Sequence, residues 1–401
     1  MKATIGLFGF GVVGQGFYQI LSQKNGTAPG RIARICVRDP HKTRSLPGHH
    51  FTFNPADILD DPDITHVVEL TDRPDDAFHI VKTALQQGKT VISANKKMLS
   101  DRLAELAECQ RNSTGLLLYE ASACGSIPVF QNLERYYAHD EVEHIQGVFN
   151  GSTNYILTKM AENGWGYTEA LARAQALGFA ETDPTLDVDA HDPASKLALL
   201  CAHALGLLIA PDDILRFGIR TVARADIDFA AHRGCKIRLL GSASLLPGGQ
   251  LQAFVLPAFV SGESPFYALN DEYNGVQIQS RYMDKQVLTG KGAGGYPTGF
   301  AVLSDLAASV CPGAAGYGRL QSAKKTTPSQ ESEIRLYVRF PDPRQRHLLP
   351  LLHIEQEEMS DGGLQIIGRA RLQAIREARL HLLEQGVFLA RWEDLSAEAV
   401  S

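Results

Sequence analysis

The sequence predicts an α/β protein whose first domain is a doubly wound, mostly parallel sheet. Two observations support this prediction: short apolar runs alternate with helical stretches between residues 4 and 119, and a glycine cluster joins the first apolar run to the first helix. Such alternation specifies parallel strands with helices on both faces of the sheet. After about Ile127 the rhythm changes to longer helical stretches with isolated strands, which predicts a second domain of mixed α+β type.

The elements of the first domain, residues 1–127, follow from the apolar periodicity. We expect strands at residues 4–8, 32–37, 66–70, 90–93 and 116–119, and helices at residues 12–22, 75–87 and 102–111. The second domain is expected at residues 128–289, and the chain is expected to rejoin the first domain over about residues 290–312. In the second domain the pattern predicts a helix to Tyr137, a strand at 144–149, helices through Leu208, and strands at 252–260 and 275–279.

Residues 313–401 are predicted to form a linker and a third, small domain. Residues 313–333 are rich in Gly, Ser, Thr and Lys, as is typical of a linker. Residues 334–401 are expected to form a small α+β domain, with strands at 334–340, 363–369 and 387–392 and a helix at 372–385. A chain of 401 residues suits two or three domains, because single cores stop growing beyond about 250–300 residues.

Composition excludes several classes of partner. The net charge is -6 and the basic residues are scattered, so we expect no nucleic-acid partner. The most apolar stretch, residues 197–210, is shorter than a membrane span and contains His203, so it predicts a buried helix and no membrane partner. The six cysteines form no C-x-x-C pair and no signal peptide is recognised, so a cytoplasmic protein with reduced thiols is expected.

A glycine motif between the first strand and the first helix predicts dinucleotide binding. This G-x-G-x-x-G motif consists of Gly9, Phe10, Gly11, Val12, Val13 and Gly14. The first glycine permits a tight turn, the second lets the pyrophosphate approach the backbone, and the third lets helix and strand pack closely. Free N–H groups at the helix start then hold the phosphates. The first domain is therefore predicted to be a Rossmann-type nucleotide-binding domain.

Two residues at the end of the second strand bear on the choice of cofactor. An acidic residue there favours the ribose 2′-hydroxyl of NAD, whereas an arginine accommodates the 2′-phosphate of NADP. The chain has both, Arg38 followed by Asp39, and the pair also suits an ordinary solvated turn. We expect NADP on account of Arg38, with NAD as the open alternative.

A lysine surrounded by carboxylates in sequence suggests acid–base chemistry. Asp192 followed by Pro193 predicts a helix start with Asp192 as the N-cap, and Lys196 then lies four residues further on the same face. A cation in the first turn of a helix needs a compensating partner, and such a lysine can exchange a proton with an alcohol or alkoxide. Glu181 and Asp187 remain to hold the ammonium of an amino-acid substrate. The alternative is a capped helix with an ordinary ion pair.

The segment 178–197 resembles the signature of the homoserine dehydrogenase family, in which G-x-x-E-x-D-P is followed by L-D-V and D-x-x-x-K-L. Further motifs resemble the family in the same order: Ala-Asn-Lys at 94–96, Tyr-Glu-Ala-Ser at 119–122, Gly-Ser-Thr-Asn-Tyr-Ile-Leu at 151–157, Gly-Ala-Gly at 292–294 and Pro-Thr at 297–298. The resemblance covers about residues 1–310. It implies NAD(P)-dependent interconversion of L-aspartate 4-semialdehyde and L-homoserine in threonine, methionine and isoleucine biosynthesis, by a homodimer or homotetramer that associates through the second domain.

The same resemblance implies the roles of individual residues. Lys196 would be the proton donor and acceptor, with Lys96 beside it near the nicotinamide; without the resemblance, Lys96 suits a solvated lysine after a strand. The residues that bind the amino acid and orient the lysine would be Glu181, Asp187 and Asp192. Those along the cofactor would be Thr71, Lys96, Gly178 and Gly294. A sodium ion would lie on the backbone carbonyls of Glu120, Ala123, Gly125 and Ile127.

The chain departs from the family in supporting loops. Ala-Cys-Gly-Ser at 123–126 replaces V-G-G-G or V-G-A-G, Ala190 replaces a common glycine, and Thr-Asp-Arg at 71–73 replaces an apolar, glycine-rich turn. The bulk of Cys124 and Ser126 could alter the ion site, although a buried and inert Cys124 is the preferred interpretation.

The C-terminal residues carry a weaker resemblance. Many relatives end in an ACT domain, a βαββαβ unit that senses threonine. Residues 340–345 lack the Pro-Gly of its ligand turn, so we expect a diverged ACT-like domain that packs within an oligomer.

Two other functions remain open from the sequence. One is a related amino-acid or aldehyde dehydrogenase, because fold does not fix substrate. The other is a non-catalytic, NADP-dependent sensor on the same scaffold.

Overall fold

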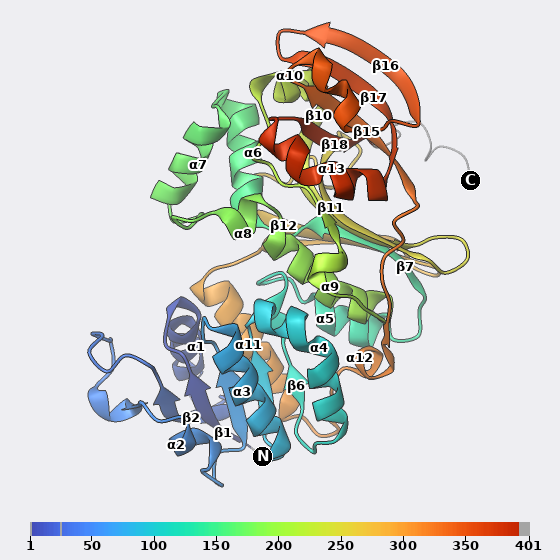
Figure 1. Cartoon of the computed structure of the whole chain (residues 1–401). Helices are drawn as coiled ribbons and strands as arrows, with labels where there is room; N and C mark the ends of the chain where they lie inside the picture. Colours follow the sequence, from blue (N-terminus) through green and yellow to red (C-terminus); the bar gives the residue numbers. More distant parts are fainter. Residues whose placement is uncertain (1, 25, 393–401) are drawn as a thin grey trace. The chain divides into compact units, whose positions relative to one another are not determined.

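The computed structural model describes residues 2–24 and 26–392, so the last nine residues of the expected C-terminal domain lie outside the described part. The chain forms two compact units, each built on its own large sheet (Figure 1). Unit 1 comprises Met1–Glu141, Ala198–Leu208 and Gly290–Lys325. Unit 2 comprises Val142–Leu197, Ile209–Thr289 and Thr326–Ser401.

Unit 1 contains a six-stranded sheet in the order β3-β2-β1-β4-β5-β6, and every pair is parallel. The strands are β1 Ala3–Phe8, β2 Gly30–Cys36, β3 Phe51–Thr52, β4 His66–Glu69, β5 Thr90–Ser93 and β6 Leu117–Leu118. The helices between them are α1 Val12–Ser22, α2 Ala56–Leu59, α3 Pro74–Gln86 and α4 Lys96–Arg111. This strand order is that of a doubly wound dinucleotide-binding domain, so the predicted fold class is confirmed.

A late segment of the chain packs against the helix that follows the glycine motif. This segment is α11, Gly295–Ser309, and it lies in the same unit as α1. A Cβ on Gly16 would overlap the carbonyl of Gly295, and a Cβ on Gly299 would lie 2.6 Å from the backbone nitrogen of Phe17. Glycines therefore let the two helix backbones approach closely.

Several elements of unit 1 differ from the predicted ones. Helix α4 begins at Lys96 rather than at residue 102, because the Asn95 side chain accepts a hydrogen bond from the backbone N–H of Met98 at 3.0 Å and caps the helix. The helix expected to end at Tyr137 is a short α5, Val129–Gln131, followed by a π-helical turn, η3, Asn132–Tyr136.

The segments around Leu208 and in the predicted linker are also more structured than expected. Helix α9, His191–Ala204, ends before Leu208, and β8, Leu207–Leu208, pairs with β14, Lys324–Lys325. The linker includes α12, Gly318–Ser322, and the side chains of Tyr317 and Leu320 are buried. The abundance of small polar residues in this segment predicted a linker, but its Tyr317 and Leu320 are part of the core.

Unit 2 contains a ten-stranded sheet with the path β13-β12-β7-β10-β11-β18-β15-β17-β16, and β9 pairs with β11 off this path. Its strands are β7 Val142–Val148, β9 Leu215–Arg216, β10 Cys235–Leu245, β11 Leu251–Ser261, β12 Tyr273–Ser280, β13 Asp284–Lys291, β15 Glu333–Phe340, β16 His353–Ser360, β17 Gly363–Arg371 and β18 Phe388–Trp392. Its helices are α6 Gly151–Asn163, α7 Tyr167–Ala176, α8 Thr185–Val188, the first part of α9 (residues 191–197), α10 Arg224–His232 and α13 Leu372–Glu384.

The C-terminal strands extend the sheet of unit 2. Strand β18 runs parallel to β11, with Ala258 opposite Arg391, so residues 326–392 belong to one compact unit with the segments before them. The four strands follow the order β18-β15-β17-β16, and the chain runs β15, a 3-10 turn η5 at Pro343–Leu348, β16, β17, α13, β18. This is a βαββαβ sequence of elements in which the first helix is only a 3-10 turn.

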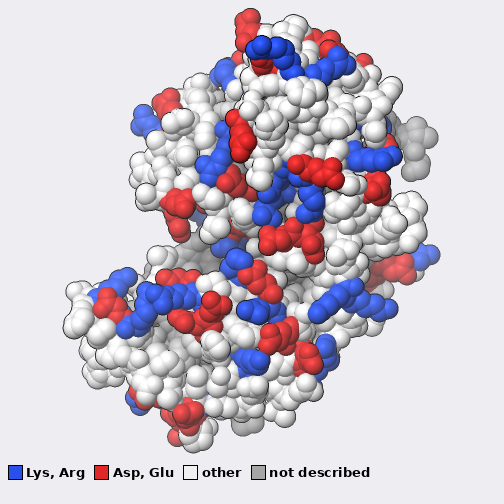
Figure 2. Space-filling view, viewed as in Figure 1, with Lys and Arg blue, Asp and Glu red and all other residues white. Residues whose placement is uncertain are grey.

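The surface carries both signs of charge. On the face shown in Figure 2, basic side chains of the described residues are interspersed with acidic ones. Within residues 2–24 and 26–392, no helix is long and apolar enough to cross a membrane.

Candidate active site

Each of the three glycines in the motif is required for a different steric reason. Gly9 has a φ of +90°, and a Cβ there would lie 2.5 Å from the carbonyl oxygen of Leu70. A Cβ on Gly14 would lie 2.6 Å from the carbonyl oxygen of Gly9, whereas a Cβ on Gly11 would have nothing within 4 Å. The space beside Gly11 is where a pyrophosphate can approach. Helix α1 starts at Val12 without a side-chain cap, so its first N–H groups are available to phosphate oxygens.

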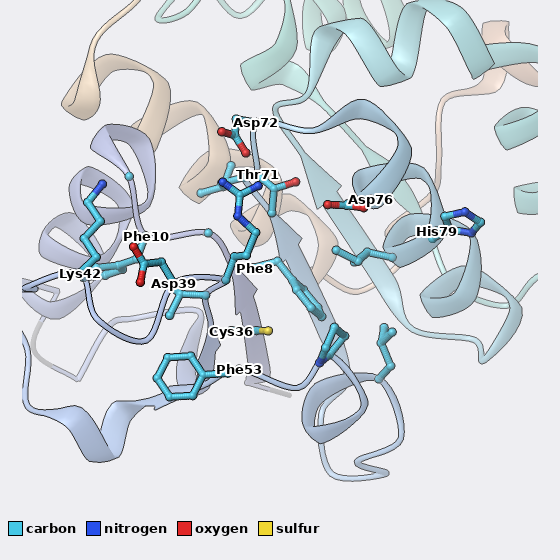
Figure 3. Close-up of a pocket in the computed structure, with 18 of the residues that line it drawn as sticks. Phe8, Phe10, Cys36, Asp39, Lys42, Phe53, Thr71, Asp72, Asp76 and His79 are labelled. Carbon is cyan, nitrogen blue, oxygen red and sulfur yellow. The ribbon is translucent and has the colours of Figure 1, made fainter.

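A cavity of about 620 Å³ opens beside this turn and is the candidate cofactor pocket (Figure 3). Its size suits a ligand pocket, for which about 300–1,000 Å³ is usual. Asp39 and Lys42 lie on one side of it, and Asp76 and His79 lie on the opposite side. The predicted cofactor residues that line it are Gly9, Phe10, Gly11, Arg38 and Thr71.

The turn after β2 brings three cations and one carboxylate to the pocket. Arg38, Lys42 and Arg44 line it together with Asp39. Asp39 accepts a hydrogen bond from the backbone N–H of His41 at 2.8 Å, which lowers the pKa of its carboxyl. Arg44 donates to the carbonyl oxygens of Asp39 at 2.7 Å and Lys42 at 2.8 Å, and so holds the turn. Positive charge dominates this edge of the pocket.

Glu69, for which the sequence carries no functional signal, joins the turn after β4, which lines the pocket, to the end of β5. Its buried carboxylate accepts hydrogen bonds from the N–H and hydroxyl of Thr71, at 2.7 and 2.6 Å, and from the hydroxyl of Ser93 at 2.7 Å. Burial raises the pKa of Glu69. Asn95 joins the network, since its side chain donates to the Thr71 carbonyl at 3.2 Å. The next residue, Lys96, is half-buried at the start of α4.

Unit 2 holds the predicted lysine in a buried polar cluster. Lys196 on α9 is 7 % exposed, and its ammonium lies 3.0 Å from Oδ2 of Asp192. It also donates to the carbonyl oxygen of Phe149 at 2.6 Å. The expected pairing of residues four apart is therefore present, and it is buried rather than solvated. A buried ammonium requires such acceptors, because desolvation without them is costly.

The predicted start of this helix is wrong. Helix α9 begins at His191, so Asp192 lies inside the first turn and is not the N-cap. Pro193 is then the third helical residue, still within the turn whose N–H groups lack helical partners. Ala190, before the helix, has a φ of +66°, a conformation that costs a non-glycine residue about 1–2 kcal/mol. This backbone explains why glycine would be common there.

Of the other two predicted substrate residues, Asp187 lies near the lysine cluster and Glu181 does not. Asp187 on α8 is close to the cluster, since its Oδ1 accepts a hydrogen bond from Asn150 at 2.6 Å. Burial and the neighbouring Asp192 raise the pKa of Asp187. Glu181 instead lies exposed on the loop after α7, and Gly178, with a φ of +77°, begins that loop. The structure thus brings together Asp187, Asp192 and Lys196 and leaves Glu181 in solvent.

The turn at residues 120–127 is buried in unit 1. The Glu120 carboxylate accepts from the N–H groups of Phe130 at 3.0 Å and Gln131 at 2.7 Å, and the Glu120 N–H donates to Asp305 at 2.8 Å. Burial raises the pKa of Glu120 to about 8 and that of Asp305 to about 7. Gly125 has a φ of +58°.

The structure also places the remaining predicted residues of the ion and cofactor sites in unit 1. Ala123, Cys124 and Ile127 are buried, and Gly294, with a φ of +120°, precedes α11. Among the described residues, no cluster of three or more His, Cys, Asp or Glu could hold a metal ion.

A doubly wound sheet, a glycine turn open to a pyrophosphate and a buried lysine–carboxylate pair define a dinucleotide-dependent oxidoreductase. Residues 9–120 match the family model for the homoserine dehydrogenase NAD binding domain, and residues 128–307 match the model for homoserine dehydrogenase. The chain belongs to the homoserine dehydrogenase family.

Individual relatives agree with this assignment. The chain is 34% identical over 317 residues to the homoserine dehydrogenase of Lactococcus lactis, covering 76% of this chain and 74% of that protein. It is 34% identical over 318 residues to that of Bacillus subtilis, covering 77% and 73%. A crystal structure of a homoserine dehydrogenase from Thiobacillus denitrificans superposes with a TM-score of 0.85 at 26% identity, covering 99% of both chains.

The family assignment decides the reaction. The enzyme interconverts L-aspartate 4-semialdehyde and L-homoserine with a nicotinamide dinucleotide, so the predicted activity is confirmed. The two alternatives, a non-catalytic sensor and a related amino-acid or aldehyde dehydrogenase, are not favoured.

We predict that Glu69→Leu weakens dinucleotide binding about tenfold, equivalent to roughly 1.4 kcal/mol. Leucine removes the acceptor shared by Thr71 and Ser93 and releases the turn after β4 from the end of β5, whereas Glu69→Gln keeps one oxygen acceptor and loses less. The dissociation constant of the dinucleotide, measured by fluorescence titration, checks this. Glu105→Gln, which changes an exposed carboxylate paired with Lys82, is the matched control. A folded Glu69→Leu protein with unchanged affinity would contradict the assigned role.

Proposed function

We propose that Lys196 is the proton donor and acceptor of the reaction. The observation that carries this proposal is its buried ammonium, held between Asp192 and the Phe149 carbonyl. When bound, the nicotinamide supplies a hydride to the aldehyde carbon or accepts one from the alcohol carbon. Lys196 gives its proton to the carbonyl oxygen as the new C–H bond forms, and it takes the hydroxyl proton back in the reverse direction. Asp192 keeps the ammonium in place.

The amino group of the substrate would be bound by carboxylates of unit 2. Asp187 and Asp192 lie together there, and Glu181 supplies a further carboxylate from its loop. We assign Lys96 a second polar contact near the nicotinamide. Along the cofactor we place Thr71, Gly178 and Gly294 beside the glycine motif.

NADP is the cofactor that we propose. Arg38, Lys42 and Arg44 line one edge of the pocket, and their charge suits a 2′-phosphate. The carboxylate of Asp39, which would favour NAD, already accepts a hydrogen bond from its own turn. A hyperthermophilic archaeal homoserine dehydrogenase that is 24% identical and superposes with a TM-score of 0.66 was solved in complex with NADPH. That complex supports the same choice here.

The proposal also includes a bound sodium ion, an oligomeric state and a cellular location. A hard cation prefers oxygen ligands, so sodium would use the carbonyls of Glu120, Ala123, Gly125 and Ile127. It would favour the ionised form of the buried Glu120 carboxylate. We further propose a cytoplasmic homodimer or homotetramer associated through residues 128–289, in which the C-terminal strands are a diverged ACT-like unit.

We predict that Lys196→Ala lowers turnover by roughly 10²- to 10⁴-fold, the usual contribution of a general acid. The measurement is the initial rate of NADPH oxidation with aspartate semialdehyde. Lys159→Ala removes a lysine with surface ion pairs from the same unit and should leave the rate near that of the wild type. Near-normal turnover of Lys196→Ala would overturn the assigned role.

We also predict that Arg38→Ala lowers the preference for NADPH over NADH about tenfold, because a charged contact to the 2′-phosphate is lost; such a loss is roughly 1.4 kcal/mol. The ratio of kcat/KM values for the two cofactors checks this. Asp39→Ala should not lower that ratio. If the wild type prefers NADH, or if Arg38→Ala leaves the ratio unchanged, the NADP assignment is wrong.

A further inference from the structure

Asn150, between β7 and α6, is a buried residue to which no role has yet been assigned. It is 5 % exposed, and both ends of its amide are engaged. The side-chain nitrogen donates to Oδ1 of Asp187 at 2.6 Å and to Oδ2 of Asp192 at 2.9 Å. The side-chain oxygen accepts from the backbone N–H of Thr153 at 2.9 Å and from its hydroxyl at 3.1 Å. One amide therefore joins three elements, α6, α8 and α9.

The two carboxylates that share this amide would otherwise repel each other. Asp192 is buried, Asp187 is half-buried, and like charges at short range in a poorly solvated site are unfavourable. Two N–H groups placed between two acceptors offset that repulsion without adding a charge. Asp192 uses the same Oδ2 atom to contact Lys196 at 3.0 Å. Asn150 therefore helps to fix the position of Asp192, the carboxylate that pairs with Lys196.

The residue before it strengthens this connection. Phe149 offers the carbonyl oxygen to which Lys196 donates at 2.6 Å. The dipeptide Phe149-Asn150 therefore contacts Lys196, Asp192 and Asp187. The two residues that follow β7 therefore contact the whole cluster, Phe149 through its carbonyl and Asn150 through its side-chain amide.

We propose that Asn150 is a positioning residue for the reaction, which holds Asp187 and Asp192 together so that Asp192 stays directed at Lys196 and Asp187 stays directed at the substrate amino group. This inference rests on the roles proposed above for those three residues. A residue that merely caps α6 would need only the bond to Thr153.

Two substitutions separate positioning from capping. Asn150→Asp keeps the shape and the acceptor for Thr153 but replaces the shared donor with a third carboxylate oxygen. Asn150→Ser keeps an N-cap hydroxyl and removes both donors, since serine caps helices about as well as asparagine. If Asn150 only caps α6, both variants should behave like the wild type.

We predict that, at neutral pH, Asn150→Asp lowers kcat/KM for homoserine oxidation about 100-fold and Asn150→Ser lowers it about tenfold, the scale of one or two lost hydrogen bonds to charged groups. The pH profile adds a readout that loss of stability would not move. The Asn150 hydrogen bond lowers the pKa of Asp187, so its loss raises that pKa. Asp187 then keeps its proton to a higher pH, and the acidic limb of the pH–rate profile of Asn150→Ser should lie at higher pH than that of the wild type. Raising the pH should restore only the part of the activity that is lost through protonation of Asp187.

The groups that act on Asp187 make this sign definite. The charged groups facing it are Asp192 and Lys196 on α9, and α6 presents the uncharged Asn150 and Ser152. Neither charged group is changed by Asn150→Ser.

Asn154→Asp is the matched control on the same helix. Its buried amide donates to the carbonyls of Leu269 and Tyr273, at 3.0 and 3.1 Å, so its loss should lower thermal stability and leave the acidic limb in place. Should Asn150→Asp fail to fold, Asn150→Ser alone decides the question.

Each outcome has a distinct meaning. Wild-type kcat/KM and pH profile for Asn150→Ser, with turnover abolished in Lys196→Ala, would overturn the positioning role alone. Retained turnover in Lys196→Ala would overturn the proposed proton donor, and the positioning role with it.

Discussion

A lysine ammonium that is buried near the start of a helix is unfavourable unless oxygen acceptors surround it, because desolvation opposes the charge. In unit 2 this requirement determines the local structure around Lys196. Asp192 must lie inside the first turn to reach it, and the carbonyl at the end of β7 must turn toward it. The strained backbone of Ala190 is part of the same arrangement, since the helix begins directly after it.

Unit 1 also contains a buried ionisable group that needs hydrogen-bonding partners, the carboxylate of Glu69. Glu69 ends a strand of the parallel sheet and would be costly to bury without donors. Three donors satisfy it, two from Thr71 in the turn after β4 and one from Ser93 at the end of β5, shortly before Lys96 in the chain. Glycines provide the remaining space, because only a residue without a Cβ fits at Gly9 and Gly14. In each unit a buried charged group holds together loops whose residues we propose to take part in binding or catalysis.

Much of this organisation could be predicted from the sequence, because local patterns express it. Alternation of strands and helices predicted the parallel sheet, and the glycine spacing predicted the cofactor turn. The pair Asp192 and Lys196 followed from helical spacing. Strand β10 was missed because it is buried on both faces for most of its length and shows no alternation. The start of α9 was misplaced because Ala190 adopts a conformation that favours glycine.

The remaining features depend on contacts between distant segments. Glu69 stands in an apolar run, and only the folded turns reveal its three donors. Asn150 resembles a helix cap until α8 and α9 are seen to meet its amide. Residues 334–392 look like a separate domain in sequence, but the pairing of β18 with β11 makes their strands part of the sheet of unit 2.

The most direct test of the central claim is a crystal structure of the enzyme with oxidised cofactor and L-homoserine. The account predicts the Lys196 ammonium at hydrogen-bonding distance, about 2.6–3.2 Å, from the substrate hydroxyl, with Asp192 still in contact with the lysine. A homoserine whose hydroxyl is bound by other groups, with Lys196 directed only at Asp192 and the Phe149 carbonyl, would contradict it.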